Sequence, residues 1–233
     1  WRNVINRGPI LANDGSRRLR IDYAELSLIG ARDDNQDRVS AAVAEHAAML
    51  VAVDGMGGHA DGDRAAEVTL KVLVEAFWHT PQPLFDPIGF LHLTLGRAHE
   101  AVVQLGASLP IENRPRATCA VCLVQGESAY WAHVGDSRVY LLRGATVAER
   151  TRDHSHVEFL LRKGVITAEQ VLNHPMRNFV ESCVGGDPIL PEMAITGRHG
   201  LAPNDVLLVC TDGFWGNLAD DDIARSLLNG GGA

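Results

Sequence analysis

Met49-Leu50-Val51-Ala52-Val53-Asp54-Gly55 is an apolar run that ends in an Asp-Gly pair, and Val206-Leu207-Leu208-Val209-Cys210-Thr211-Asp212-Gly213 repeats this arrangement. Each apolar run has the length and character of a buried strand. Carboxylates at the ends of buried strands repel one another unless a positive charge lies between them. A divalent cation is the simplest such charge, because Mg²⁺ and Mn²⁺ prefer carboxylate, carbonyl and water oxygens. The glycine after each aspartate lets the backbone turn tightly, so that its own carbonyl can approach the ion.

Two further segments contain aspartates: Arg32-Asp33-Asp34-Asn35-Gln36-Asp37 and Gly135-Asp136-Ser137-Arg138. An isolated Asp-Gly pair is usually a turn, and the carboxyl of Asp136 could equally accept hydrogen bonds from the amides of its own hairpin. Ser137 lacks the histidine and aspartate pattern that accompanies a serine nucleophile, so we expect it to make local hydrogen bonds only.

The rest of the chain contains strand-like and helix-like segments. Two long segments with apolar residues at helical spacing, 61–80 and 87–107, are separated by Pro81 and Pro83. They interrupt a series of short strands instead of alternating with them, so we predict an α+β fold with two mainly antiparallel sheets packed together and helices outside. The predicted strands are 22–29, 38–44, 47–53, 117–124, 128–134, 138–142 and 206–210; a helix-like insertion covers 154–175, and a final helix covers 220–228.

Size and charge exclude several classes of protein. The chain has 233 residues, enough for one sizeable domain, and its formal net charge is −8. An acidic chain without clustered Lys and Arg is not expected to bind nucleic acid. Its apolar runs are too short for a transmembrane helix, and we expect no secretory signal.

Two of the four cysteines form Cys119-Ala120-Val121-Cys122, a spacing that elsewhere suggests zinc or redox chemistry. Here it lies inside an apolar strand-like run, where an odd spacing places the two side chains on opposite faces. The sequence contains no second Cys-x-x-Cys that could complete a zinc site. We therefore predict that all four, including Cys183 and Cys210, are small core residues of a reducing compartment.

The order of the aspartate segments resembles that of the metal-dependent serine/threonine protein phosphatases of type 2C, in their bacterial form. Arg32 to Asp37 is similar to the first family motif, and Asp54-Gly55-Met56-Gly57-Gly58-His59 to the bacterial second motif. The remaining four motifs are matched in order by residues 135–140, 151–155, 178–187 and 207–215. The resemblance runs from about Tyr23 to Leu228.

This resemblance implies a four-layer αββα architecture: a central β-sandwich, helices on both outer faces, and metals in a cleft at one end of the sandwich. The phosphatase domain would cover residues 21–233, after a lead-in segment at 1–20, and a flap beside the cleft would cover about 153–178. The family usually ends in a further strand that carries a metal-binding aspartate. No aspartate follows Asp222, so we expect this strand to be missing.

The resemblance also implies a site for two ions. Asp54 would bridge the two ions together with the carbonyl of Gly55. Asp212 would bind one ion, and Asp37 would bind the other, directly or through water. Asp136 would help to hold a third, weaker ion.

Two positions near these ligands matter for the chemistry that the resemblance implies. Arg32 occupies the family's phosphate-binding position, where its guanidinium can hold two phosphoryl oxygens; the alternative is a surface ion pair with Asp33 or Asp34. Met56 stands where animal members have a general-acid histidine. His59 follows three residues later, as in bacterial members, and we expect it to be structural.

The implied activity is hydrolysis of phosphoserine and phosphothreonine in proteins by a hydroxide that bridges Mn²⁺ or Mg²⁺ ions. The implied setting is a bacterial cytoplasm, where a monomeric enzyme opposes a Ser/Thr kinase and acts on the substrates of that kinase. An alternative is a catalytically weak phosphatase-like module that binds a partner or phosphoprotein, because the terminal aspartate is missing. A small-molecule phosphate hydrolase is a third interpretation, which the family's shallow cleft and flap disfavour by analogy.

Overall fold

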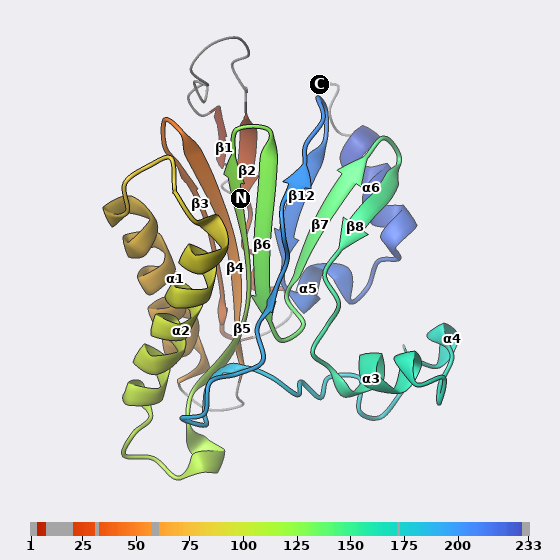
Figure 1. Ribbon diagram of the computed structural model, residues 1–233. Coiled ribbons are helices and arrows are strands. Elements are labelled where there is room, and N and C mark those ends of the chain that lie inside the picture. Colours follow the sequence, from red (N-terminus) through yellow and green to blue (C-terminus); the bar gives the residue numbers. More distant parts are fainter. Residues whose placement is uncertain (1–3, 8–20, 31–32, 57–60, 172, 230–233) are drawn as a thin grey trace.

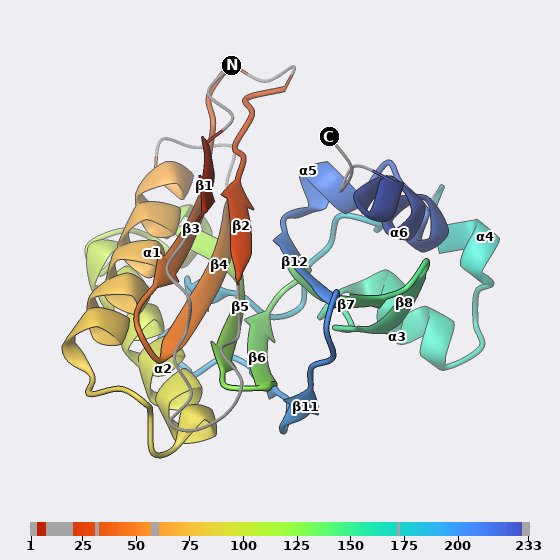
Figure 2. The same cartoon turned by 90° about the horizontal axis from the view of Figure 1, so that it is seen from above.

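The computed structural model describes residues 4–7, 21–30, 33–56, 61–171 and 173–229. Two antiparallel sheets lie next to each other at the centre, and helices lie on the outer side of each (Figure 1). Seen from above, the layers follow the order helices, larger sheet, smaller sheet, helix (Figure 2). The arrangement confirms the predicted α+β fold of two mainly antiparallel sheets flanked by helices.

The larger sheet has seven strands, all paired antiparallel. They are β3 (Asp37–Val43), β4 (Ala47–Met56), β5 (Arg116–Gln125), β6 (Ser128–Val134), β9 (Val184–Gly185), β10 (Ala194–Ile195) and β11 (His199–Gly200). The two central strands, β4 and β5, are buried along most of their length. Their near-continuous apolar sequence follows from this burial, because one face meets helices and the other meets the second sheet.

The smaller sheet has the strand order β12 (Val206–Cys210), β7 (Arg138–Arg143) and β8 (Thr146–Arg150). A separate two-stranded sheet pairs β1 (Val4–Arg7) with β2 (Asp22–Glu25) in antiparallel register. β1 lies inside the segment 1–20 that the sequence led us to expect as a lead-in.

Two long helices, α1 (Gly62–His79) and α2 (Pro87–Leu105), cover the outer face of the larger sheet (Figure 1). α2 begins where the carboxylate of Asp86 accepts a hydrogen bond from the backbone N–H of Gly89, at 2.9 Å. Within the described part of the chain, no helix combines the length and the apolar character needed to cross a membrane. The shorter helices are η1 (Ile111–Asn113), α3 (His156–Arg162), α4 (Ala168–Val171), α5 (Asp212–Trp215) and α6 (Asp220–Asn229).

Three apolar clusters fill the three spaces between the four layers. The first contains Leu73 of α1 and Val121 of β5, between the long helices and the larger sheet. The second contains Trp131 and Leu141, between the two sheets. The third joins the smaller sheet to α6 through residues such as Ile223. Since neighbouring residues of a strand point to opposite faces, each central strand contributes to two clusters.

The cysteines follow this alternation. Cys119 belongs to the first cluster and Cys122 to the second, so their side chains lie on opposite faces of β5, as predicted. Burial raises the pKa of both thiols to about 12, which makes them poor metal ligands and poor nucleophiles. All four cysteines are free. Cys183 is half-buried, whereas we predicted a core position for it.

Several elements differ from the sequence-based expectation, among them the short strands β1, β9, β10 and β11, which were not expected. The strand expected over 22–29 ends at Glu25, and the residues after it, including Leu26 and Leu28, are exposed. β8 was not expected, because its polar sequence lacks a strand-like alternation; it forms through antiparallel pairing with β7. The short helix α5 was not expected either, since a single turn shows no periodicity.

We predict that His133, a buried residue of β6, makes folding sensitive to acid. Its Nε2 donates a hydrogen bond to the carbonyl of Arg152 at 2.6 Å, and its ring stacks on His154 with centroids 4.6 Å apart. Burial, followed by the charge of His154, lowers the pKa of His133 to about 4. The neutral ring therefore contributes stability that is present above about pH 6.5 and is lost as the pH falls towards 4.

The test is a His133→Gln variant, compared with wild type by urea unfolding at pH 7 and pH 4 in EDTA. Between these two values the wild type should lose about 1 to 3 kcal/mol more unfolding free energy than the variant. Equal losses in the two proteins would contradict the assignment of this acid sensitivity to His133.

Candidate functional site

Four aspartates from distant parts of the chain lie at one end of the sandwich. Asp37 begins β3, Asp54 lies near the end of β4, Asp136 lies in the turn between β6 and β7, and Asp212 begins α5. That turn and the start of α5 lie at the lower end of the sheets in Figure 1. The negative charges of the other three aspartates all act on the carboxyl group of Asp54. The fold thus brings together the aspartates that the sequence singled out.

The register of the larger sheet explains why two of them are neighbours. Asp37 lies directly opposite Asp54 in the β3–β4 pair, and Thr118 lies opposite Asp54 in the β4–β5 pair. Directly opposed residues share one face of a sheet. Alternation along β4 shows that this is the face between the two sheets, where Ala48 and Leu50 also lie. Asp54 therefore lies in line with the apolar side chains of β4 that face the second sheet, and it places a carboxyl group at the end of this row.

Among the neighbouring charges, that of Asp212 acts most strongly on the carboxyl group of Asp54. Burial, and then the negative charges of Asp212, Asp37 and Asp136, raise the pKa of Asp54 to about 8. Neighbouring negative charges disfavour ionisation of a carboxyl group, so Asp54 keeps its proton to a higher pH than an isolated aspartate does. In the absence of a cation, Asp54 therefore stays protonated at neutral pH.

Asp37 is oriented by hydrogen bonds to its side chain and its backbone. The hydroxyl of Thr211, the residue before Asp212, donates to Oδ2 of Asp37 at 3.0 Å. The backbone N–H of Asp37 donates to Oδ1 of Asn35 at 3.0 Å. The contact with Thr211 links β3 of the larger sheet to the end of β12 in the smaller sheet, so both sheets contribute to the site.

Asp136 is the most deeply buried of the four, with 6% of its surface exposed. Its Oδ1 is buried without a hydrogen-bond partner among the described residues. Burial, and then the charges of Asp212 and Asp153, raise the pKa of Asp136 to about 7. A buried carboxyl oxygen without a partner is costly, and a cation would satisfy it.

The turn that carries Asp136 is held by contacts from other strands. The hydroxyl groups of Thr118 and Ser137 are 2.7 Å apart and hydrogen-bonded, and both residues are buried. Gly135 has a φ of +94°, and a Cβ there would collide with the side chain of Thr118, so only glycine fits. We expected Ser137 to make local hydrogen bonds; its partner is instead a residue of the neighbouring strand β5.

Gly55 is a point of close backbone approach. Its N–H donates to the carbonyl of Gln36 at 3.2 Å. A Cβ on Gly55 would overlap the carbonyl oxygen of Gly62 at the start of α1. A side chain is therefore excluded at this position, which allows α1 to begin directly against the end of β4.

The donor set suits a hard cation, because carboxylate and carbonyl oxygens make up all of it. Asp54 and Asp136 both have raised pKa values, and Oδ1 of Asp136 has no hydrogen-bond partner in the described part of the chain, as expected for a site that a cation would neutralise. Among the described residues, however, no group of three or more His, Cys, Asp or Glu side chains is arranged to hold an ion. The chemistry of these oxygen donors nevertheless fits a hard metal ion.

Two residues that the sequence singled out, Arg32 and His59, lie outside the described residues. Other contributors escaped notice because their roles depend on folding. Thr211 contacts Asp37 across 174 positions of sequence. Trp215 lies three residues after Asp212, so one helical turn brings it back to the same side of α5, a spacing that could have drawn attention to it.

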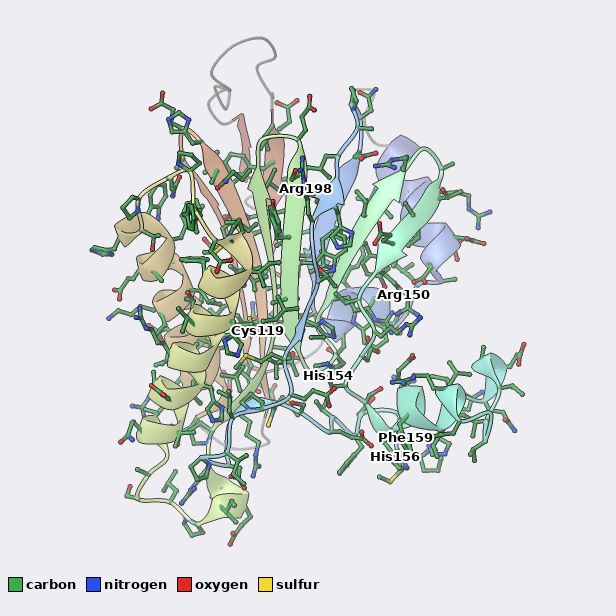
Figure 3. All side chains as sticks on the ribbon, in the orientation of Figure 1. Cys119, Arg150, His154, His156, Phe159 and Arg198 are labelled. Atoms are coloured by element: carbon green, nitrogen blue, oxygen red, sulfur yellow. The ribbon has the colours of Figure 1, made fainter. Side chains whose placement is uncertain are left out.

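The segment between β8 and β9 extends beyond this end of the sandwich, where α3 carries His156 and Phe159 (Figure 3). The backbone N–H of His154 donates to the carbonyl of Gly135 at 2.8 Å, which ties the start of this segment to the turn that carries Asp136. Phe159 is 45% exposed and Phe179 is 52% exposed. The helix-like insertion expected over 154–175 contains α3 and α4.

Comparison with known proteins finds a family and several bacterial relatives. The family model described as "Protein phosphatase 2C" matches residues 27–229. Protein phosphatase PhpP of Streptococcus pneumoniae is 31% identical over 196 residues, which cover 82% of this chain and 78% of that protein. Serine/threonine protein phosphatase PstP of Mycobacterium tuberculosis is 30% identical over 210 residues, or 90% of this chain and 39% of PstP. The chain thus spans well under half of the mycobacterial protein.

Solved structures show the same architecture. A serine/threonine phosphatase of S. agalactiae superimposes with a TM-score of 0.75 at 28% identity, over 87% of this chain and 83% of that one. The catalytic domain of PstP in complex with two manganese ions superimposes with a TM-score of 0.70 at 26% identity, over 85% of this chain and 80% of that one.

We predict that Asp54→Asn stabilises the metal-free protein at alkaline pH. Because the pKa of Asp54 is raised to about 8, its protonated form contributes stability below about pH 4 that is lost as the pH rises through 8. Asparagine is neutral at every pH. In EDTA, the variant should therefore gain about 1 to 3 kcal/mol of unfolding free energy relative to wild type between pH 5 and pH 9.

Urea unfolding at the two pH values measures this change. Asp86→Asn is the matched control, because asparagine also caps a helix and Asp86 lies away from the cluster. If the unfolding free energies of Asp54→Asn and wild type change equally between pH 5 and pH 9, the neighbouring carboxylates do not affect Asp54 as proposed.

Proposed function

This chain belongs to the protein phosphatase 2C family, and we propose that it hydrolyses phosphoserine and phosphothreonine in proteins with divalent cations. The observation that carries the proposal is the crowding of Asp54 by Asp37, Asp136 and Asp212, which raises its pKa to about 8. Relatives named serine/threonine phosphatases support the choice of substrate. The family match supports the reaction type.

The proposed metal ligands are the five residues that the sequence indicated. Asp54 and the carbonyl of Gly55 would hold both of two ions, Asp212 would hold one of them, and Asp37 would hold the other, directly or through water. Asp136 serves a third. Mn²⁺ and Mg²⁺ both suit such a set of oxygens, and the PstP structure with two manganese ions supports the first of these metals.

When bound, the ions lower the pKa of a water molecule and neutralise charge on the phosphoryl oxygens. The chain itself holds the carboxylates: Thr211 orients Asp37, and the backbone of Gly55 closes the site against α1. In this proposal Arg32 binds the phosphoryl group. Ser137 does not act as a nucleophile in this proposal, because its hydroxyl is buried and hydrogen-bonded to Thr118.

The proposed domain covers residues 21–233, with about 153–178 as a flap beside the site and 1–20 as a lead-in. The attachment of His154 to Gly135 supports the flap, because it places this segment next to the turn that carries Asp136. The proposed substrates are phosphoproteins, including targets of a Ser/Thr kinase that the enzyme opposes as a monomer in a bacterial cytoplasm. The bacterial relatives support this setting.

A second candidate function is a phosphatase-like module that binds phosphoproteins and hydrolyses them weakly. It is favoured by one observation: within the described residues, no three metal-binding side chains are arranged to hold an ion. The two candidates differ in their rate of phosphate release.

We predict that the protein releases phosphate from a phosphothreonine peptide in Mn²⁺ and stops when EDTA is added. Asp54→Asn should lower kcat by at least about a hundredfold, because the charges of the other three aspartates all act on this residue and it is the proposed ligand of two ions. Phosphate release measures the rate, and Asp86→Asn should behave as wild type.

Two results would decide against this function. Phosphate release that continues at the same rate in EDTA would rule out metal-dependent chemistry. A folded protein that binds the phosphopeptide but releases no phosphate in Mn²⁺ would leave the binding module as the function.

A further inference from the structure

Trp215, the last residue of α5, connects two of the proposed metal-binding segments. Its indole Nε1–H donates a hydrogen bond to the backbone carbonyl of Asp136 at 3.0 Å. The helix that carries Trp215 begins at Asp212. The side chain of Trp215 therefore links the helix that begins at Asp212 to the turn that contains Asp136.

The indole ring of Trp215 also stacks on the guanidinium group of Arg138. The guanidinium carbon of Arg138 lies 3.4 Å from the centroid of the indole ring, a cation–π contact. Arg138 is itself held by two hydrogen bonds to the carboxylate of Asp153, at 2.8 and 2.7 Å, and by a third to the hydroxyl of Tyr140 at 2.9 Å. The side chains of Arg138 and Asp153 are 12% and 7% exposed, so Trp215 stacks on a rigid support.

A rigid support is needed because the two segments repel each other. Asp136 is 6% exposed in its turn, and Asp212 begins the helix that carries Trp215. A turn that carries a buried carboxylate moves away from a second carboxylate unless another contact opposes the motion. The hydrogen bond from Trp215 to the backbone of Asp136 supplies such a contact without adding charge.

We propose that Trp215 is a positioning residue, which holds the turn of Asp136 beside Asp212 so that Asp136 can bind its ion. The proposal rests on the proposed metal centre and adds to it a residue that touches neither ion nor substrate. Arg138 serves the same purpose one step further away, by fixing the plane of the indole ring.

The test is a Trp215→Phe variant, which keeps an aromatic ring over Arg138 and removes the N–H donor. Mn²⁺ binding is measured by isothermal titration calorimetry in wild type, Trp215→Phe and Asp136→Asn. The weakest class of ion in wild type should disappear in Asp136→Asn. In Trp215→Phe it should bind about three- to tenfold more weakly, as the loss of one ordinary hydrogen bond implies. The tighter ions should bind both variants as they bind wild type.

A second readout uses Trp215 itself. Adding Mg²⁺ should change the tryptophan fluorescence of the wild type, and Trp215→Phe and Asp136→Asn should each abolish the weaker phase of that change. Trp78→Phe is the matched control: this tryptophan is 54% exposed near the end of α1 and packs against Phe77. The control should keep both the fluorescence change and the affinities.

Three results would overturn the proposal. Trp215→Phe could bind every ion with unchanged affinity, or it could lose affinity for all ions equally and melt at a lower temperature. The third result is a weaker fluorescence phase that persists in Trp215→Phe. If Trp215→Phe does not fold, Arg138→Lys takes its place: it removes the planar support of the indole ring and should weaken the same class of ion, and unchanged affinities would overturn the proposal. Absence of Mn²⁺ binding in the wild type would refute the proposed function itself, which separates that failure from a failure of the role of Trp215.

Discussion

The repulsion among buried carboxylates at one end of the β-sandwich is the constraint on which the rest of this structure depends. Asp54 continues the inter-sheet face of β4 beyond its apolar residues, and the charges of three other aspartates converge on it. Like charges in a partly buried space favour protonation or a cation. The high pKa of Asp54 records this crowding, and the same crowding makes the site suitable for hard divalent ions.

The surrounding fold is arranged to resist that repulsion. The contact between Thr211 and Asp37 links the end of the smaller sheet to the larger one, and the buried pair of Thr118 and Ser137 holds the turn of Asp136. Trp215 adds a contact from α5 to the same turn. Each contact joins segments far apart in sequence, so the geometry of the site depends on the packing of both sheets.

Much of this could be predicted from local pattern, and some of it could not. The apolar runs of β4 and β12 and the helical spacing of α1 and α2 are local features, and the structure places all four elements close to their predicted bounds. β8 escaped prediction because its polar sequence becomes a strand only through pairing with β7. Arg138 was visible as part of a motif, but its stacking under Trp215 depends on how α5 packs against β7.

The sequence by itself determined which residue types lie at the strand ends, the four-aspartate composition of the site, and a family identity carried by ordered motifs. These are properties of neighbouring residues along the chain, for which periodicity and residue chemistry suffice. Only the tertiary structure decided that Asp37 lies opposite Asp54, that the charge of Asp212 acts on Asp54, and that Asp136 is buried. Strand register and burial arise from contacts between distant segments, and the electrostatic energy of a carboxylate depends on the distances and solvent exposure that those contacts establish.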